Sequence, residues 1–338
     1  MSNQENPTLN QKQILYETNR QDWLNYLADN NLSTIPALVI DASSRCDYGQ
    51  CPACYFMDDE GQRCPNQDLA LSTVKEWKQI FTESGIIPQQ VWLPGGEPTL
   101  NPQIIEIINS LKTLIPEICL VSNGFNLANY AYAKELLLKS QLTEIDITIN
   151  GANPDVHNLM MAPLTSLEWQ KVPNLALPDL IKNVFTGQIE MNNFAKAYQA
   201  LINIAKISEE LKKPLIIGLN LNMNHGADLD KLLEKVDQDG GRVDSVIFQS
   251  MQASTRSRNR EKNNPSFSWQ IPTAEMINKY LKQAEQLLNS GKIKSASIID
   301  PLPKELVDTL DLTNNPIYQP SDTPAIGVDG KFRTNVLI

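Results

Sequence analysis

Six short apolar segments alternate with segments of helical periodicity along most of this chain. The apolar segments span residues 37–41, 90–93, 118–122, 144–150, 215–222 and 245–249. Apolar residues recurring every three or four positions predict helices over residues 10–30, 72–84, 102–114, 130–140, 193–211, 229–238 and 273–290. Strands that alternate with helices predict an α/β fold with a parallel sheet, because parallel strands are joined by crossovers that are almost always right-handed.

Composition excludes several function classes. The chain has 338 residues, of which 41% are hydrophobic and 20% charged, as in an ordinary soluble globular protein. Its formal net charge of −10 argues against nonspecific nucleic-acid binding, which depends on neutralising phosphates. No apolar run approaches the roughly 20 residues of a membrane-spanning helix. The polar first ten residues do not resemble a signal peptide, so we expect a cytoplasmic protein without a membrane partner.

Three cysteines lie close together just after the first apolar segment. Cys46, Cys51 and Cys54 fall within nine residues, a spacing suited to a loop that gathers thiolates at the end of a strand. Three thiolates can hold three irons of a four-iron cluster and leave the fourth iron open to a small molecule. The alternative is a zinc site with Cys64 as the fourth thiolate. Of the two, the iron–sulfur interpretation is favoured, since zinc explains nothing outside this loop.

Other polar motifs also follow predicted strands. Gly95-Gly96-Glu97-Pro98 follows the second, Ser122-Asn123-Gly124 the third, and Thr148 and Asn150 end the fourth. Asn220 and Asn222 lie on one side of the fifth, where buried amides are costly unless hydrogen-bonded. Parallel α/β folds bind ligands at the carboxyl ends of their strands, so these motifs predict one shared site.

The cysteine loop and the Gly-Gly-Glu-Pro motif, in this order, resemble the radical S-adenosylmethionine (SAM) superfamily. The chain departs from the usual pattern by having four residues rather than three between Cys46 and Cys51. It also has Ala53 where an aromatic residue is usual, with Tyr55 and Phe56 following. The resemblance implies a partial (β/α)6 barrel and a [4Fe-4S] cluster held by the three cysteines. It further implies SAM bound at the open iron and cleaved to a 5′-deoxyadenosyl radical.

The resemblance also assigns roles to the strand-end motifs. Gly95, Gly96, Glu97 and Pro98 would receive the amino group of SAM, although Glu97 also suits a helix N-cap. Ser122 and Asn123 would reach the ribose or the methionine carboxylate, and Thr148 and Asn150 occupy positions where the family has polar residues. We expect Asn220 and Asn222 to contact SAM or substrate. His157 also occupies a recurrent position, but we expect it and His225 to be structural.

Three parts of the chain are expected: an N-terminal helical segment over residues 1–35, the barrel over 36–300 and a C-terminal extension over 301–338. Residues 161–191 interrupt the barrel and are either a lid or substrate-binding insertion, or a surface elaboration. Asp329-Gly330 predicts a hairpin, which resembles the one that opens the C-terminal extension of peptide-modifying radical SAM enzymes. No cysteine lies beyond Cys119, so residues 301–338 have no thiolates for a second cluster.

The favoured hypothesis is a radical SAM enzyme acting on a ribosomally made precursor peptide. The overall pattern resembles cyanobacterial-type peptide maturases, including spliceases that excise a tyrosine-derived fragment. That resemblance implies a precursor peptide, a small peptide-recognition protein and reduced flavodoxin or ferredoxin as partners. The basic segment over residues 256–262 is either a carboxylate clamp or a solvated loop. The alternatives are a radical SAM enzyme acting on a small metabolite, and a non-catalytic zinc or iron–sulfur protein.

Overall fold

The computed structural model describes residues 9–47, 54, 56, 64–149, 154, 157, 193–223, 229–249, 273–299, 302, 304–319 and 323–334. Cys51, Asn150, His225, the insertion over 161–191 and the basic segment over 256–262 lie outside these described residues.

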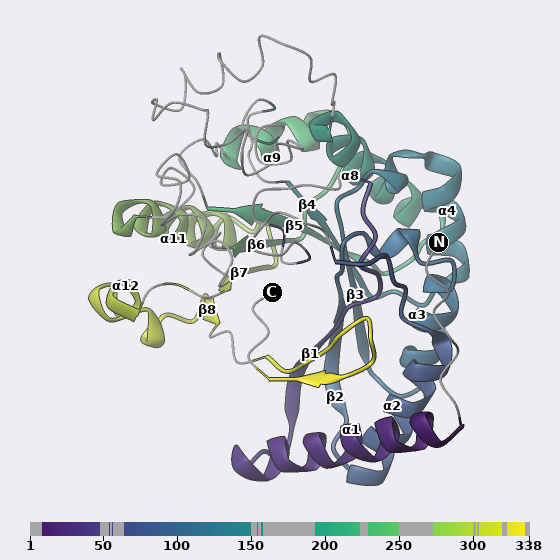
Figure 1. The fold of residues 1–338 in the computed structure, drawn as a ribbon. Helices are drawn as coiled ribbons and strands as arrows, with labels where there is room; N and C mark the ends of the chain where they lie inside the picture. Colours follow the sequence, from purple (N-terminus) through teal and green to yellow (C-terminus); the bar gives the residue numbers. More distant parts are fainter. Residues whose placement is uncertain are drawn as a thin grey trace, which may run out of the picture.

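One curved sheet organises the structure (Figure 1). Its strands run in the order β10-β9-β1-β2-β3-β4-β5-β6-β7-β8, and every neighbouring pair is parallel except β9 and β10. The strands are β1 (Ile35–Ile40), β2 (Pro88–Leu93), β3 (Glu117–Ser122), β4 (Glu144–Thr148), β5 (Ile216–Asn222), β6 (Ser245–Gln249), β7 (Ser295–Ile299), β8 (Tyr318–Gln319), β9 (Ala325–Ile326) and β10 (Phe332–Arg333). The sheet does not close on itself, because β10 and β8 are its two edges. This arrangement confirms the predicted α/β partial barrel.

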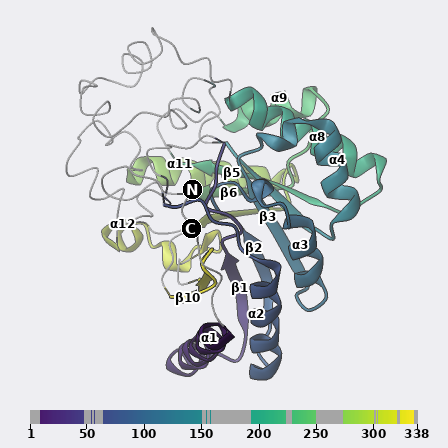
Figure 2. The ribbon, with the colours of Figure 1, turned by 45° about the vertical axis from the view of Figure 1, so that its right-hand side comes forward.

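Helices form an outer arc around the sheet, which Figures 1 and 2 show from two directions. The α-helices are α1 (Leu9–Asp29), α2 (Leu71–Ser84), α3 (Ile104–Lys112), α4 (Tyr130–Lys139), α8 (Asn193–Glu210), α9 (Leu229–Gln238), α11 (Ala274–Asn289) and α12 (Lys304–Thr309). Short 3-10 helices η1 (Pro98–Leu100), η2 (Asn126–Ala128) and η5 (Leu312–Asn314) lie in the connections. Among the described helices, none is long and apolar enough to cross a membrane.

The two faces of the sheet differ in chemistry because side chains alternate along each strand. On β4, Ile145 and Ile147 are fully buried in the core between the sheet and the outer helices. Glu144 and Asp146, which alternate with them, lie on the opposite face. Residues of β1, β2, β4, β6 and β7 line one common cavity on that face. We call the space enclosed by this concave face the lumen.

The C-terminal segment is part of the barrel. The predicted hairpin is confirmed, since β9 and β10 pair antiparallel around Gly330, whose φ of +76° suits glycine. Its first strand also pairs parallel with β1, which the sequence did not predict. The Gly330 carbonyl accepts hydrogen bonds from Asn19 Nδ2 and Trp77 Nε1, both at 2.9 Å. Phe332 packs edge-on against Trp23, so the hairpin connects α1 and α2 to the sheet.

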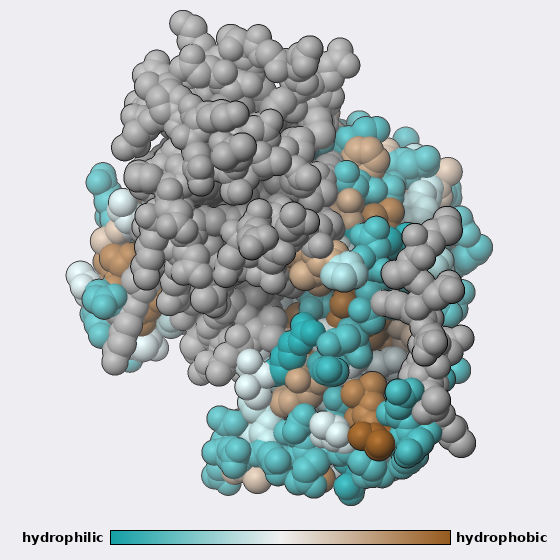
Figure 3. Space-filling model, in the orientation of Figure 1, coloured by the Kyte–Doolittle hydropathy of each residue, from teal (hydrophilic) through white to brown (hydrophobic). Residues whose placement is uncertain are grey.

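All six predicted strands are present within a few residues of their expected bounds. Two further parallel strands, β7 and β8, were not predicted. β8 has only two residues, too few for a periodic pattern, and β7 contains three serines and alanines in five residues. On the face shown in Figure 3, hydrophilic residues predominate around α1, with scattered hydrophobic ones.

Candidate active site

The carboxyl ends of β1 and β2 are hydrogen-bonded to each other beyond the strands themselves. The Gly96 amide donates to the Ser43 carbonyl at 2.7 Å. The Glu97 amide donates to the Arg45 carbonyl at 2.6 Å. The Gly-Gly-Glu-Pro turn therefore fixes the backbone immediately before Cys46, the first cysteine of the loop.

The close approach of this turn to Ser43 requires glycine at position 95. Its φ is +152°, and a Cβ at this position would lie 2.4 Å from the Ser43 carbonyl oxygen. No side chain fits at that distance, so only glycine lets the turn pack against the residues that lead to the cysteines. Gly124, after β3, is similar: its φ is +80°, and a Cβ there would lie 2.9 Å from the Cα of Ala197 on α8.

Glu97 joins the ends of β2 and β3. Its side chain is fully buried, and it accepts four hydrogen bonds from backbone and side-chain donors. One oxygen accepts from the Thr99 amide at 3.0 Å, the Thr99 hydroxyl at 2.5 Å and the Ser122 hydroxyl at 2.9 Å. The other oxygen accepts from the Asn123 amide at 2.8 Å. Burial raises the pKa of the Glu97 carboxyl, and these hydrogen bonds oppose that shift.

Asn123 connects the third strand end to the cysteine loop. Its Nδ2 lies 3.6 Å from Cys46 Sγ, within the range of a hydrogen bond to sulfur. Its Oδ1 accepts from the Phe125 amide at 2.8 Å, which orients the amide group. The structure thus brings together Cys46, the Gly-Gly-Glu-Pro turn and the Ser122–Gly124 triplet, as predicted from their positions at strand ends.

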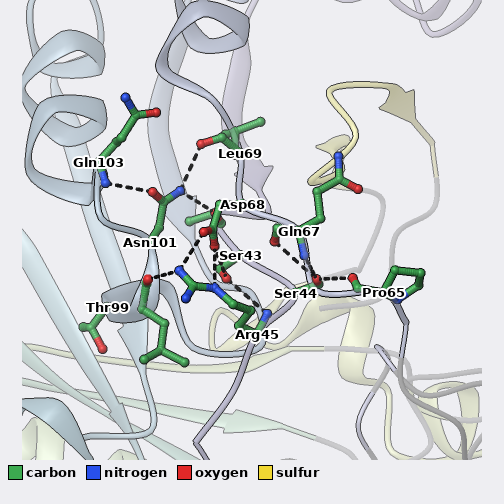
Figure 4. Close-up of polar contacts among 12 residues, drawn as sticks. Ser43, Ser44, Arg45, Pro65, Gln67, Asp68, Leu69, Thr99, Asn101 and Gln103 are labelled. Atoms are coloured by element: carbon green, nitrogen blue, oxygen red, sulfur yellow. Dashed lines mark hydrogen bonds and ion pairs between the residues drawn. The ribbon is translucent and has the colours of Figure 1, made fainter. Parts of the chain in front are cut away.

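A polar network closes the base of the cysteine loop, which runs from residue 46 to residue 64 (Figure 4). Arg45 forms a two-pronged ion pair with Asp68, with Nε–Oδ1 at 3.1 Å and Nη2–Oδ2 at 2.6 Å. Ser43 donates to the same carboxylate at 2.7 Å. Ser44 donates to the Pro65 carbonyl at 2.7 Å. The segments that enter and leave the loop are therefore held side by side.

Asn101, the residue that follows η1, supports the same base. Its Nδ2 donates to the Ala42 carbonyl at 2.8 Å and to the Leu69 carbonyl at 3.0 Å, and its Oδ1 accepts from the Gln103 amide at 2.9 Å. Neither Asn101 nor the Arg45–Asp68 pair was predicted from the sequence. Apart from Gln103, their partners lie 23 to 59 residues away, and no local pattern marks such pairs.

Two of the three predicted metal ligands are described. Cys46 and Cys54 are both partly exposed, and neither forms a disulfide within the described part of the chain. Both belong to the loop whose base is fixed as above, and Cys51 lies between them. Partly exposed thiols without disulfides suit an iron–sulfur cluster, which such a loop could hold with an open iron. The thiolate set therefore fits, and the ligand assignment stays a prediction.

The remaining predicted contacts lie on β4 and β5. Thr148 and Asn220 are paired across the two strands, and Asn220 is buried. The backbone of Asn222 belongs to β5. His157 is buried, and its ring packs edge-on against Phe194 at 5.8 Å, as expected of a structural histidine. Burial lowers the pKa of His157 to about 3, so it is uncharged at neutral pH.

Cys119 lies among apolar residues on β3, a position typical of a core residue. It is fully buried, but its thiol faces the lumen rather than the outer helices. There Sγ donates to Asp146 Oδ2 at 3.2 Å. Burial and the neighbouring carboxylates raise the pKa of this thiol well above its usual range. It is therefore a neutral thiol, unlike the predicted cluster thiolates.

Comparison with known proteins agrees with this geometry. Residues 40–177 match the radical SAM superfamily, a range that includes the cysteine loop and the ends of β1 to β4. Among curated proteins, the GTP 3′,8-cyclase of Microcystis aeruginosa is 28% identical over 144 residues, or 41% of this chain and 42% of the cyclase. A probable GTP 3′,8-cyclase of Saccharolobus islandicus is 24% identical over 202 residues, or 57% of this chain and 60% of that protein. The chain covers less than half the length of the first cyclases that it matches.

A solved structure shares the fold over nearly the whole chain. SuiB of Streptococcus suis bound to its precursor peptide SuiA has a TM-score of 0.56 at 13% identity, covering 98% of this chain and 66% of SuiB. SuiB bound to S-adenosylmethionine has a TM-score of 0.54, also at 13% identity, covering 92% of this chain and 63% of SuiB. Residues 40–177, which include the cysteine loop and the joined strand ends, are thus similar to the radical SAM superfamily, and the fold shared with SuiB agrees with this match.

Proposed function

We propose that this chain is an enzyme that generates a 5′-deoxyadenosyl radical from SAM and uses it to modify a ribosomally made peptide. The observation that carries the proposal is the contact of Cys46 with Asn123 beside the buried carboxylate of Glu97. It unites the ends of β1, β2 and β3 in one site. The radical SAM superfamily uses a [4Fe-4S] cluster and SAM. When bound, the reduced cluster supplies the electron that breaks a sulfonium C–S bond of SAM.

The chain's own residues would hold and position these groups. Cys46, Cys51 and Cys54 would ligate the cluster. The partly exposed backbone of Gly95 and Gly96 would receive the SAM amino group, since both Glu97 oxygens already accept hydrogen bonds from the protein. The Arg45–Asp68 base would keep the loop in one geometry before the cluster binds. Such positioning matters because the radical reacts with whatever carbon lies nearest.

Two substrate classes are supported by different comparisons. The fold of SuiB, a protein solved with its precursor peptide, covers 98% of this chain. The match to a cyclase named for GTP covers 41% of this chain. The broader coverage favours a peptide, with tyrosine splicing as one form of the modification. A small metabolite such as a nucleotide is the second candidate. A reduced flavodoxin or ferredoxin would supply the electron, and a small recognition protein would deliver the peptide.

The first test is anaerobic reconstitution with iron and sulfide, followed by reduction with SAM present and measurement of 5′-deoxyadenosine. We expect product from the wild type and none from Cys46→Ala, Cys51→Ala or Cys54→Ala. Cys64→Ala is the matched control, because Cys64 belongs to the same loop but is not a proposed cluster ligand. No product from the wild type, together with tightly bound zinc that Cys64→Ala loses, would instead support a four-thiolate zinc site.

The substrate class is tested in the same assay. Candidate precursor peptides and GTP are added separately, and each is examined by mass spectrometry. A mass change in a peptide, accompanied by faster 5′-deoxyadenosine formation, is the expected result. A product from GTP with every peptide unchanged would reject the peptide and support the metabolite.

A further inference from the structure

Three reactive side chains lie together in the lumen, on strands β3 and β4. The ligand-type atoms of Cys119, Glu144 and Asp146 all lie within 4.8 Å of one another. They are separate from the cysteine loop and from the Gly-Gly-Glu-Pro turn, so the proposed binding of the cluster and SAM uses none of them. Cys119 and Asp146 are buried and Glu144 is half-buried, and such a cluster requires a physical explanation.

Two acceptors in this part of the lumen have no donor among the described residues. Asp146 Oδ1 and Asn220 Oδ1 are buried without a hydrogen-bond partner there, in residues that are 1% and 3% exposed. Asp146 pairs across the sheet with Gly218, and Asn220 lies two positions further along β5, on the same face. A Cβ on Gly218 would lie 1.7 Å from Asp146 Oδ1, so the carboxyl group lies directly over this glycine. An unmet buried acceptor lowers stability, and a ligand that carries hydrogen-bond donors would remove this cost.

Among the described residues, neither Glu144 nor Asp146 has an ion-pair partner, whereas the nearby Asp244 pairs with Arg242 and Lys294. Glu144 accepts neutral hydrogen bonds, from Gln90 at 3.0 Å and from Ser245 at 3.4 Å. Burial, together with the neighbouring Glu144, raises the pKa of Asp146 to about 8. Two carboxylates this close cannot both ionise cheaply without a cation between or beside them.

A cavity of about 680 Å³ lies at the amino-terminal ends of β1, β4, β6 and β7, next to Glu144 of this cluster. It is lined by Gln90, Trp92, Glu144 and Ser245 among others, so it borders the acidic cluster at Glu144 and has an aromatic wall at Trp92. This volume lies in the range of sites that bind organic ligands. A bare metal ion would need no such space, whereas an alkyl chain ending in a cationic group would fill it. Aromatic rings such as that of Trp92 also attract organic cations.

We propose that the lumen binds a protonated amine or guanidinium group of the substrate, with Asp146 and Glu144 neutralising its charge and Asn220 accepting one of its hydrogen bonds. This inference rests on the proposed function and names the substrate class of that site. For a peptide substrate, the group is a lysine or arginine side chain near the modified residue. The net charge of −10 would attract such a segment toward the protein.

The test measures binding of four probes to the full-length reconstituted protein with SAM, by calorimetry or ligand-observed NMR. The probes are the Nα-acetyl methylamides of lysine and arginine, of norleucine as the uncharged isostere of lysine, and of glutamate as the opposite charge. The variants are Asp146→Asn and Glu144→Gln, which preserve side-chain size. Glu106→Gln, on the exposed face of α3, is the control for the same change in charge. Formation of 5′-deoxyadenosine without substrate is measured on each preparation.

The expected result is binding of the lysine or arginine probe that weakens about tenfold or more in Asp146→Asn and Glu144→Gln and is unchanged in Glu106→Gln. Equal binding of the norleucine probe, no binding of any probe, or a stoichiometric metal ion lost in Asp146→Asn would each overturn the proposal. A protein that cleaves SAM but binds no cationic probe refutes only this inference. A protein that binds the probe but does not cleave SAM refutes the proposed function instead.

Discussion

Buried polar groups at the rim of the barrel and in its lumen differ in whether their hydrogen bonds are satisfied. At the rim, formed by the carboxyl ends of β1, β2 and β3, Glu97 accepts four hydrogen bonds and Asn101 makes three. In the lumen, Asp146 Oδ1 and Asn220 Oδ1 have no donor among the described residues. Both levels are buried, so exposure to water does not explain the contrast.

We interpret the difference as one between positioning a bound cofactor at the rim and recognising a substrate in the lumen. A saturated network holds one geometry, because each group that moves would lose its hydrogen bonds. The rim therefore suits a group that must be placed accurately, as the cluster and SAM must be. Unmet acceptors lower stability until a partner arrives, so the lumen suits a group that comes and goes, as a substrate does. Substitutions at the rim and in the lumen test this contrast.

The largest effect is expected for Glu97→Ala at the rim. The substitution leaves four donors without an acceptor in a fully buried site, and we expect a loss of about 3–5 kcal/mol in the free energy of unfolding. Reconstituted iron should fall as well, because Asn123 and the loop base lose their common anchor. Denaturant unfolding and iron analysis measure the two effects. Glu106→Ala on α3 is the exposed control, and a similar small loss in both variants would contradict the account.

A second rim prediction compares two glycines with positive φ. Gly95→Ala would place a Cβ 2.4 Å from the Ser43 carbonyl oxygen, whereas Gly85→Ala meets nothing within 4 Å. The control should lose about 1 kcal/mol from its backbone conformation alone. Gly95→Ala should lose about 2–4 kcal/mol, because residues 43–45 must also shift, and it should bind clearly less iron. Equal iron content in the two variants would show that the turn does not set the loop geometry.

In the lumen, Asp146→Asn tests the pKa of about 8. In the unfolded chain this carboxyl group ionises near its usual value of 3.8. Between those two values the folded chain holds one more proton than the unfolded chain, so stability falls as pH rises from about 4 to about 8. Asparagine cannot titrate, so the melting temperature of Asp146→Asn relative to wild type should rise between about pH 5 and about pH 8. A difference that is constant with pH would show that Asp146 is ionised in the fold.

The smallest effect is expected at the base of the cysteine loop. The side chains of Arg45 and Asp68 are 35% and 29% exposed, so solvent weakens their ion pair. Arg45→Lys removes the two-pronged geometry and should cost about 1 kcal/mol, less at high salt. Lys235→Gln, which breaks the more exposed pair with Asp239, should cost about half as much. A larger loss in Lys235→Gln, measured by denaturant unfolding, would contradict this ranking.

The features that could be predicted depend on local sequence patterns, and those that could not depend on contacts between residues far apart in sequence. Each of the six predicted strands and the seven predicted helices has a local apolar pattern, and their order was enough to indicate a parallel barrel. The grouping of Cys46, Glu97 and Asn123 followed from their positions at strand ends. The network of Arg45, Asp68 and Asn101 joins segments far apart in sequence, and their residue types are common in loops.

The lumen was missed for a related reason. The apolar neighbours Ile118 and Leu120 would indicate that Cys119 is an apolar core residue. The alternation that buries those neighbours against the helices turns Cys119 toward Asp146 on the next strand. Glu144 and Asp146 alternate with isoleucines in the same way, but alternation alone does not show which face of an open barrel carries the polar side chains. Strand order and register were needed to show that these groups meet.

The central claim is that the rim holds a cluster with one open iron, to which SAM binds. Electron paramagnetic resonance of the reduced, reconstituted protein, recorded with and without SAM, tests this most directly. The account predicts a [4Fe-4S]⁺ signal whose g-values shift when SAM is added, in both the wild type and Asp146→Asn, and no such signal in Cys46→Ala. A signal that SAM leaves unchanged, or bound zinc in place of a cluster, would contradict it.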